Sequence, residues 1–161
     1  MPDSPPLPPS DQRYFEDYQP GAVYSFGPAA PLSVEAIVAF AQQFDPQPMH
    51  TDPAAAEAGP TGGLIASGWH TTGVMMRLFV DHYISHAATY PAPGIDELRW
   101  LRPVRPGDQL SIRVTVLETR LSRSKPDRGL VKSRVEAINE RGEAVMSLQA
   151  LNLIGVRPSA S

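Results

Sequence analysis

The chain has 161 residues, of which 42% are hydrophobic and 19% are charged, and its formal net charge is -3 at pH 7. These values are typical of one soluble globular domain with a buried core, and the slightly acidic balance gives no basis for binding nucleic acid. The chain contains no cysteine, which excludes disulfides and cysteine-ligated zinc.

Residues 1–12, "MPDSPPLPPSDQ", are rich in proline and predict a flexible or polyproline-like tail, followed by a single domain over 13–161. The tail has no apolar stretch of the kind found in signal peptides. No run of 18 apolar residues predicts a membrane span. Together with the absence of disulfides, these features lead us to expect a cytoplasmic protein.

The next elements are a short strand and two helices. The string "GAVYSF" (21–26) predicts the strand, and "LSVEAIVAFAQQF" predicts a helix with Ser33 as its N-cap. A second, short helix is predicted in "TDPAAAEAG", where Asp52 is the N-cap, Pro53 the first helical residue and Gly59 the terminator. Asp52 therefore has a structural explanation.

Asp45 and His50 lie between these two helices and have no such explanation. A carboxylate at a helix C-terminus meets the negative end of the backbone dipole, which is mildly unfavourable. In an unbroken helix, positions five apart diverge by roughly 140° around the axis. Pro46 and Pro48 break the helix between them and allow the two side chains to converge on one pocket. We therefore consider them a candidate acid/base pair.

A long, mostly buried helix is predicted from "GGLIASGWHTTGVMMRLFVDHYISHA", with one apolar stripe. The stripe comprises Ile65, Trp69, Thr72, Met76, Phe79 and Tyr83. Gly62 and Gly63 before it either offer backbone N–H groups to a developing oxyanion or simply form a turn before a close-packed helix. Ser67 is a candidate hydrogen-bond donor or nucleophile, although its surroundings do not match G-x-S-x-G.

From Leu98 onward the hydrophobic period changes to two, which predicts antiparallel strands in "QLSIRVTVLE", "LVKSRVEAINE" and "AVMSLQALNLIGV". Turns are predicted at "RPGD", "SKPDRG" and "NERGE". The order of elements predicts an α+β fold, with an antiparallel sheet wrapped around a long central helix. An edge strand of such a sheet favours pairing with a second copy, so we expect a homodimer.

Two further polar groups have simpler explanations. His82 and His86 are four residues apart and could bind zinc, but no third ligand is evident, so no metal is predicted. A basic cluster borders one hairpin, and we interpret it as a solvated turn, with contact to nucleotide phosphates as the alternative. This cluster comprises Arg120, Arg123, Lys125 and Arg128.

Together these motifs resemble the MaoC-like dehydratase family, which includes the R-specific enoyl-CoA hydratases. The core of the family motif, Asp-x-x-Pro-x-His, occurs here between Asp45 and His50. The resemblance continues through "GGLIASG", "LRWLRPVRPGDQLSIRVTVLE" and "NERGEAVMSLQALNLI". It implies a hot-dog fold, usually dimeric, and reversible addition of water to a trans-2-enoyl-CoA to give the R-3-hydroxyacyl thioester.

By the same resemblance, Asp45 and His50 form the catalytic dyad, and no metal or cofactor takes part. The oxyanion donor is a backbone amide within Gly62 and Gly63, while Ser67 and Gly68 line the substrate site. The chain departs from the usual motif at Phe44 and Gln47, which leaves the dyad intact, and at Ser67 and His70, which leaves substrate shape and acyl chain length open. The choice between coenzyme A and acyl carrier protein is also open. A hot-dog acyl-CoA thioesterase and a non-catalytic acyl-thioester-binding subunit are the alternative functions.

Overall fold

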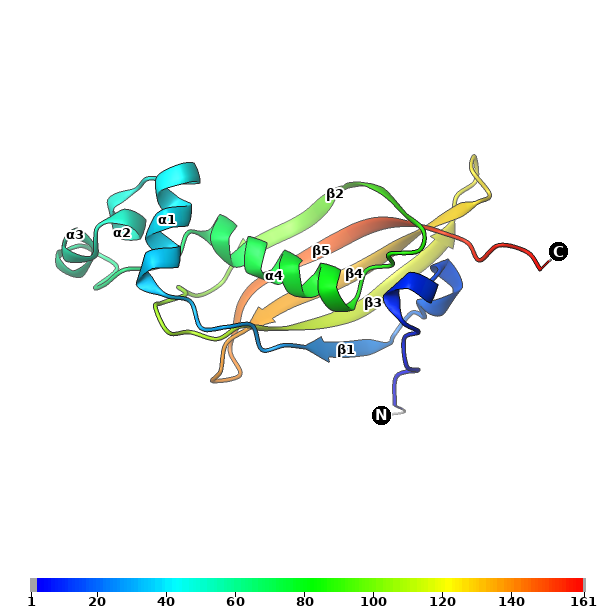
Figure 1. Ribbon diagram of the computed structural model, residues 1–161, viewed down its shortest axis with the longest axis horizontal. Coiled ribbons are helices and arrows are strands. Elements are labelled where there is room, and N and C mark those ends of the chain that lie inside the picture. Colours follow the sequence, from blue (N-terminus) through cyan, green and yellow to red (C-terminus); the bar gives the residue numbers. More distant parts are fainter. Residues whose placement is uncertain (1–2, 161) are drawn as a thin grey trace.

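The computed structural model describes residues 3–160, and Figure 1 shows how their helices and strands are arranged. The strands are β1 (Val23–Phe26), β2 (Thr89–Trp100), β3 (Ser111–Leu121), β4 (Arg128–Ile138) and β5 (Ala144–Gly155). The α-helices are α1 (Val34–Phe44), α2 (Pro48–Thr51), α3 (Pro53–Ala58) and α4 (Gly68–His82). Two short 3-10 helices, Ser10–Gln12 and Phe15–Asp17, precede β1.

The strands form one antiparallel sheet in the order β1-β3-β4-β5-β2, so β1 and β2 are its edges. The alternation predicted for the later strands is confirmed. Val114 on β3 and its cross-strand partner Val135 on β4 are both fully buried in the core.

The start of β2 corrects the expectation that the strands after the long helix begin near Leu98, because β2 begins at Thr89. Pro91 and Pro93 hide this strand from a periodicity search. They are tolerated because β2 is an edge strand, where a missing N–H costs no ladder hydrogen bond. The pairing with β5 also shifts register between Tyr90 and Gly94.

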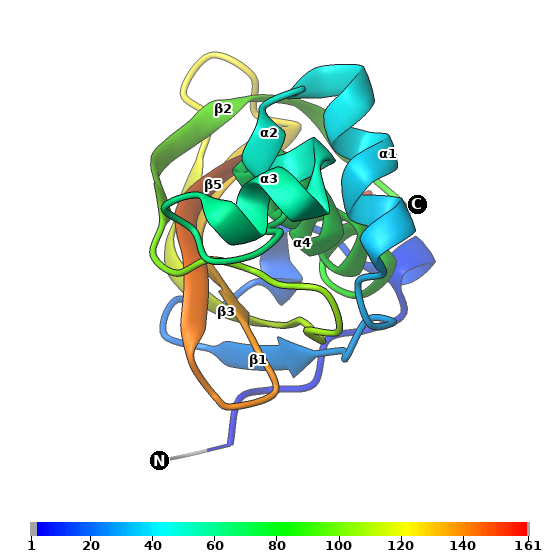
Figure 2. The same ribbon diagram turned by 90° about the vertical axis from the view of Figure 1, so that its left-hand side faces the viewer.

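Helix α4 lies against one face of the sheet, and the core is formed between them (Figures 1 and 2). Met75, Phe79 and Tyr83 belong to this core, and each exposes at most 4% of its surface. The prediction of an α+β hot-dog fold, with an antiparallel sheet wrapped around a long helix, is therefore confirmed. None of the helices in residues 3–160 has the length and hydrophobicity needed to cross a bilayer.

The predicted start of the long helix was wrong. α4 begins at Gly68, because the preceding backbone is bonded to other parts of the chain. The amide of Ile65 donates to the carbonyl of Met49 at 3.1 Å, and the amide of Ala66 donates to that of Val104 at 2.8 Å. Residues committed to these tertiary hydrogen bonds cannot also form helical ones.

The predicted burial of α4 was also wrong in part, because one side of the helix is exposed. Trp69 and Met76, both in the predicted apolar stripe, are 55% and 48% exposed. The side that packs on the sheet instead includes Thr71 and Leu78 as well as Met75. The apolar residues surround so much of the helix that the sequence could not determine which side faces the core.

Helices α1, α2 and α3 lie together at the end of the molecule where α4 begins (Figures 1 and 2). The predicted caps are confirmed. The Ser33 hydroxyl accepts a hydrogen bond from the amide of Ala36 at 3.0 Å, and the Asp52 carboxylate accepts one from the amide of Ala55 at 3.1 Å. Pro53 is the first residue of α3.

The segment before β1 contacts the other end of α4. The Arg13 guanidinium donates to the carbonyls of His82 and Tyr83, at 2.9 and 2.6 Å, and to that of Pro8. Arg13 is 5% exposed, so it satisfies the last carbonyls of α4 inside the protein. The flexibility expected of residues 1–12 stays a prediction, and residues 1–2 lie outside the described residues.

Candidate active site

The helix break predicted around Asp45 is present. α1 ends at Phe44, and Asp45 is its C-cap, with a backbone amide that donates to the carbonyl of Ala41 at 2.8 Å. The chain then turns, and Pro48 begins α2, which carries His50. The break brings the two side chains together, with Oδ2 of Asp45 at 3.4 Å from Nε2 of His50.

A backbone carbonyl fixes the protonation of the His50 ring. Nδ1 lies 2.8 Å from the carbonyl oxygen of Ile65, and a carbonyl can only accept a hydrogen bond. Nδ1 therefore carries the proton, and in the neutral ring Nε2 is the basic nitrogen that faces Asp45. His50 is 4% exposed, which restricts the ring to this orientation.

Asp45 accepts hydrogen bonds on both carboxylate oxygens. The amide nitrogen of Gln47 donates to Oδ1 at 2.7 Å, and the hydroxyl of Ser67 donates to Oδ2 at 2.8 Å. These bonds, together with the neighbouring His50, hold the pKa of the Asp45 carboxyl below its ordinary value, while burial opposes them. Asp45 is therefore an ionised carboxylate at neutral pH.

Ser67 lies at the junction of two structural roles. It is fully buried and is the N-cap of α4, where its hydroxyl oxygen accepts a hydrogen bond from the amide of Trp69 at 3.3 Å. Its proton is donated to Asp45. Ser67 thus links the start of α4 to the carboxylate and orients it.

The two glycines expected at the helix start are not brought to the dyad. The amide of Gly62 donates to the carbonyl of Gly59 at 3.2 Å, and that of Gly63 donates to Ala56 at 3.1 Å. Gly62 and Gly63 have φ values of +63° and +150°, as a turn requires. The turn interpretation, not the oxyanion interpretation, matches this geometry.

Gly68, the first residue of α4, lies in the wall of the cavity that also contains Asp45 and His50. The other amides of this first turn are used, since His70 and Thr71 both donate to the carbonyl of Ser67, at 2.9 and 3.1 Å. Within residues 3–160, the Gly68 amide has no hydrogen-bond acceptor. An amide at a helix N-terminus favours negative charge.

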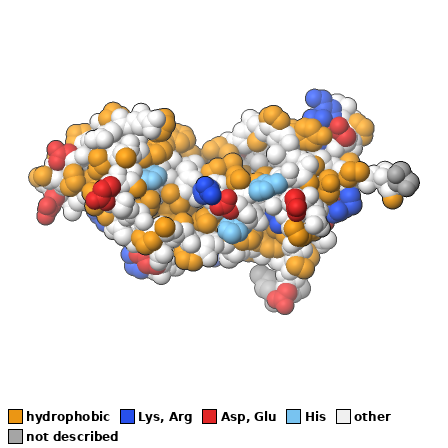
Figure 3. Space-filling view, in the orientation of Figure 1, with side chains coloured by type: hydrophobic (Ala, Val, Ile, Leu, Met, Phe, Trp, Pro, Cys, Tyr) orange, Lys and Arg blue, Asp and Glu red, His pale blue; other side chains and the backbone are white. Residues whose placement is uncertain are grey.

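Asp45 and His50 face a cavity of about 540 Å³. Its walls are mainly apolar and aromatic, and Figure 3 shows hydrophobic side chains spread over this helical end of the molecule. The Trp69 and Trp100 rings meet edge to face, with centroids 5.1 Å apart. The other lining residues are Phe44, Gln47, Met49, Ile65, Ala66, Gly68, Thr71, Leu101, Arg102, Pro103, Val104 and Val145.

The sequence indicates a site role for Asp45, His50 and Gly68 among these lining residues, but not for Gln47, Trp100 or Arg102. Gln47 was noted only as a departure from the usual motif, although its position two residues after Asp45 is a signal for a local hydrogen bond. Trp100 is the last residue of the edge strand β2 and Arg102 follows it, and nothing in their spacing connects them with the dyad. Only the fold brings them there.

The remaining candidates lie outside this cavity. His70 stacks on Phe40, with ring centroids 4.8 Å apart, and burial lowers its pKa. His82 stacks on Phe26 at 5.3 Å, and His86 forms a hydrogen bond with the hydroxyl of Ser10 at 3.2 Å. Residues 3–160 contain no cluster of three or more side chains of the metal-binding types.

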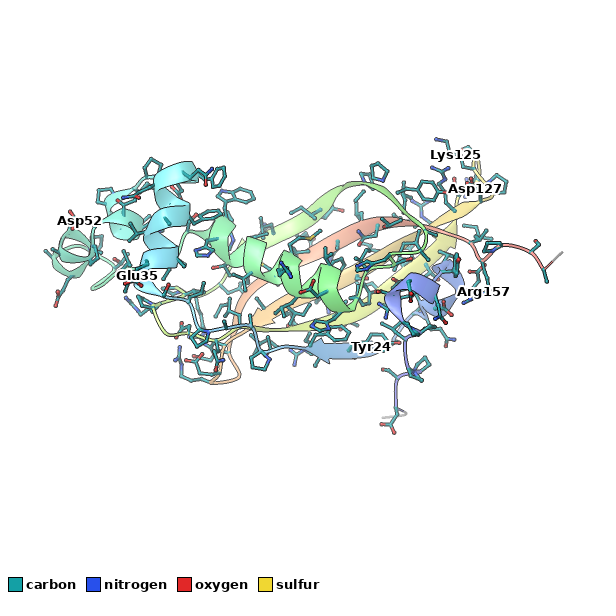
Figure 4. The ribbon with its side chains drawn as sticks, viewed as in Figure 1. Tyr24, Glu35, Asp52, Lys125, Asp127 and Arg157 are labelled. Atoms are coloured by element: carbon teal, nitrogen blue, oxygen red, sulfur yellow. The ribbon has the colours of Figure 1, made fainter. Side chains whose placement is uncertain are left out.

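The basic cluster on the β3–β4 turn is also remote. Lys125 and Asp127 lie at the opposite end of the molecule from Asp52, which is close to the dyad in the sequence (Figure 4). Arg128 is paired with Asp127 at 2.8 Å and lies over the ring of Tyr90. These contacts match the interpretation of a solvated turn.

The arrangement provides two proton acceptors and an orphan amide around one cavity. A donor placed between Oδ2 of Asp45 and Nε2 of His50 can give a hydrogen to each, and water has two. A carbonyl oxygen near the amide of Gly68 would gain stabilisation as negative charge develops on it. This combination suits proton transfer next to a carbonyl group.

The chain is similar to known proteins in both sequence and structure. A family model described as "MaoC like domain" matches residues 16–140. The MaoC-like dehydratase from Rhodospirillum rubrum is 39% identical, with a TM-score of 0.84 over 91% of this chain and 99% of that one. The Bacillus subtilis (strain 168) protein YdeM is 31% identical over 94 residues, which are 58% of this chain and 67% of YdeM.

The fold is also shared with a more distant protein. R-hydratase PhaJ1 from Pseudomonas aeruginosa is 21% identical, with a TM-score of 0.72 over 92% of this chain and 95% of that one. At this identity the similarity shows a common fold.

Proposed function

Because the chain belongs to the MaoC-like dehydratase family, we propose that it is a hydro-lyase that adds water reversibly to a trans-2-enoyl thioester and gives the R-3-hydroxyacyl thioester. The observation that carries this proposal is the pair formed by Asp45 and His50, 3.4 Å apart in the wall of one cavity. A subunit that only binds thioesters would need neither group.

The attacking water donates one hydrogen to Oδ2 of Asp45 and the other to Nε2 of His50. As its oxygen bonds to C3 of the substrate, one proton passes to Nε2, because the lowered pKa keeps Asp45 ionised. The carboxylate then stabilises the imidazolium beside it. His50 returns the proton to C2, so the product carries a hydroxyl on C3 and a hydrogen on C2.

Attack at C3 moves negative charge onto the thioester oxygen. We assign its stabilisation to the backbone amide of Gly68, which opens α4 and lines the cavity. A fixed N–H at the positive end of a helix needs no reorganisation when charge develops. The assignment replaces Gly62 and Gly63, whose amides already donate to backbone carbonyls.

We propose that the substrate is a coenzyme A thioester. We also propose that the active protein is a homodimer. The apolar and aromatic walls of the cavity support an acyl substrate. The exposed edge of β2 supports pairing between two copies, since β2 is paired on one side only within the described residues.

One assay tests the reaction. Purified protein is incubated with trans-2-butenoyl-CoA, and loss of the conjugated absorbance is followed together with release of free thiol. We expect hydration without thiol release. Thiol release at the same rate as the loss of absorbance would instead identify a thioesterase. No change in either signal would contradict both the hydratase and the thioesterase assignments.

Variants of the dyad test the site. We expect Asp45→Asn and His50→Ala each to lower the hydration rate by at least about 100-fold, as loss of an acid/base group does. Asp52→Asn is the matched control, because Asp52 caps α3 and does not line the cavity. Full activity of either dyad variant would contradict the assignment.

A further inference from the structure

The cavity that holds Asp45 and His50 has one strongly cationic side chain in its wall. Among residues 3–160, Arg102 is the only lysine or arginine in the cavity lining. Its backbone is fixed to β5, since the amides of Leu101 and Arg102 both donate to the carbonyl of Val145, at 2.8 and 3.3 Å. With 58% of its side chain exposed, the guanidinium lies at the rim of the cavity.

Arg102 has a partner that it can exchange. Nη1 lies 3.3 Å from Oε2 of Glu143, and an exposed ion pair of this kind contributes little to stability. The other oxygen of Glu143 accepts hydrogen bonds from Asn139 at 3.0 Å and from Arg141 at 2.9 Å. Glu143 therefore stays paired when Arg102 turns to an anion of higher charge.

The remaining walls define what such an anion would be attached to. Trp69 and Trp100 are 55% and 47% exposed, and their indoles belong to the same cavity lining as Arg102. Aromatic and apolar walls suit an uncharged, flexible chain that leads outward from the dyad. A cation at the end of this path suits a ligand whose charge lies at its outer end.

On this basis we propose that Arg102 binds the phosphate at the end of the pantetheine arm of the substrate. The inference rests on the proposed function, which places a thioester at the dyad. Coenzyme A and acyl carrier proteins both present this arm with a phosphate at its far end. A guanidinium recognises phosphate through charge-assisted hydrogen bonds.

The basic cluster on the β3–β4 turn is the competing cationic site. Arg120 and Arg123 line a separate cavity of about 530 Å³, whose lining also includes Leu130 and Leu153. This cavity shares no lining residue with the one that holds the dyad. Arg123 therefore provides a control for cationic charge away from the proposed site.

The first test measures binding without catalysis. Calorimetry compares 4′-phosphopantetheine with pantetheine, which differ only in the phosphate. We expect the wild-type protein to bind the phosphorylated form about tenfold more tightly, in keeping with one charged hydrogen-bonded contact. Arg102→Ala should lose this preference. Arg141→Ala, which removes the other arginine that contacts Glu143, should keep it, as should Arg123→Ala.

The inference is overturned if the wild-type protein shows no preference for the phosphate, if Arg102→Ala keeps the preference, or if Arg123→Ala loses it. Because neither ligand contains an enoyl group, these outcomes are independent of whether the protein hydrates enoyl thioesters. If the hydration assay fails but the protein still shows a phosphate preference that depends on Arg102, only the proposed reaction is contradicted.

A second test identifies the source of the arm. For Arg102→Ala we expect the KM for trans-2-butenoyl-CoA to rise about tenfold with kcat unchanged, and the KM for the N-acetylcysteamine thioester, which lacks the phosphate, to stay the same. A comparable rise with a butenoyl carrier protein would mean that both sources use Arg102. An equal rise for the N-acetylcysteamine thioester would overturn the phosphate assignment.

Discussion

The Asp45 carboxylate is held by donors from two different parts of the chain. Gln47 lies two residues away and bonds to Oδ1, while Ser67 belongs to the start of α4 and bonds to Oδ2. Both lower the pKa of Asp45, so the ionised form needed to orient water is favoured by local and by tertiary structure together.

The variant Gln47→Ala tests the local donor. Loss of this hydrogen bond, which is the largest cause of the lowered pKa, should raise the pKa of Asp45 toward the ordinary value of 3.8. The measurement is titration of the Asp45 carboxyl carbon by NMR. Gln43→Ala removes an exposed glutamine from α1 and should leave the titration unchanged. Identical midpoints for wild type and Gln47→Ala would show that the bond does not act on Asp45.

The same shift predicts a pH dependence of stability. Because the pKa of Asp45 is lower in the folded protein, its contribution to the free energy of unfolding is present above the ordinary pKa and is lost as pH falls through the folded value. The difference in unfolding free energy between wild type and Gln47→Ala should therefore be largest near neutral pH and shrink below about pH 4. Urea unfolding across this range provides the measurement.

Sequence reasoning succeeded for residues whose signal is local. Two prolines predicted the break that brings Asp45 and His50 together, and the break is present. It indicated that Gly68 lines the site but assigned the oxyanion donor to Gly62 or Gly63, because the position of an unused amide depends on where α4 begins. That in turn depends on tertiary hydrogen bonds made by Ile65 and Ala66.

Glycines within α4 differ in what surrounds them. A Cβ at Gly73 would meet no atom within 4 Å, whereas a Cβ at Gly68 would overlap the indole of Trp100. We expect Gly73→Ala to raise the free energy of unfolding by up to about 1 kcal/mol, because alanine favours helix more than glycine does. Gly68→Ala should give no such gain and should displace Trp100 from the cavity wall.

Thermal unfolding measures the stability of both variants, and the intrinsic fluorescence reports the displacement of the indole. In a Trp100→Ala background, where the overlap is absent, Gly68→Ala should raise the free energy of unfolding relative to Trp100→Ala alone. Equal stabilisation by the two glycine substitutions would contradict the close contact between Gly68 and Trp100.

The C-terminal end of α4 depends on one arginine from a distant segment. Arg13→Met should lower the free energy of unfolding by about 2 kcal/mol, because charged hydrogen bonds to buried helix-terminal carbonyls are lost. Urea denaturation gives the value. Arg77→Met, which removes an exposed ion pair with Asp81 on the same helix, should have little effect. Equal effects of the two substitutions would exclude a specific role for Arg13.

At the level of elements, prediction worked where a pattern is internal to the element. The alternation of β3 and β4 and the caps at Ser33 and Asp52 are such patterns. The edge strand β2 was missed because Pro91 and Pro93 interrupt its pattern. These prolines are tolerated because β2 lies at the edge of the sheet, and a local sequence pattern carries no information about that position.

For the whole molecule, the open edge of β2 predicts a homodimer. β2 runs over twelve residues and exposes 47% of Ile95, while the other edge, β1, has four residues. Light scattering after size-exclusion chromatography should give twice the mass of one chain. Ile95→Lys should yield monomers, because charge on an edge strand opposes pairing. Val23→Lys places the same charge on β1 and should leave the mass unchanged, so monomers from this variant would contradict the prediction.

The contact between His50 and the carbonyl of Ile65 has a consequence for evolution. The acceptor belongs to the main chain, so the side chain at position 65 can be exchanged without removing it. A lineage can thus reshape the apolar wall to admit other acyl groups while the histidine keeps its tautomer. Selection on substrate range and selection on proton transfer act here on different atoms of one residue.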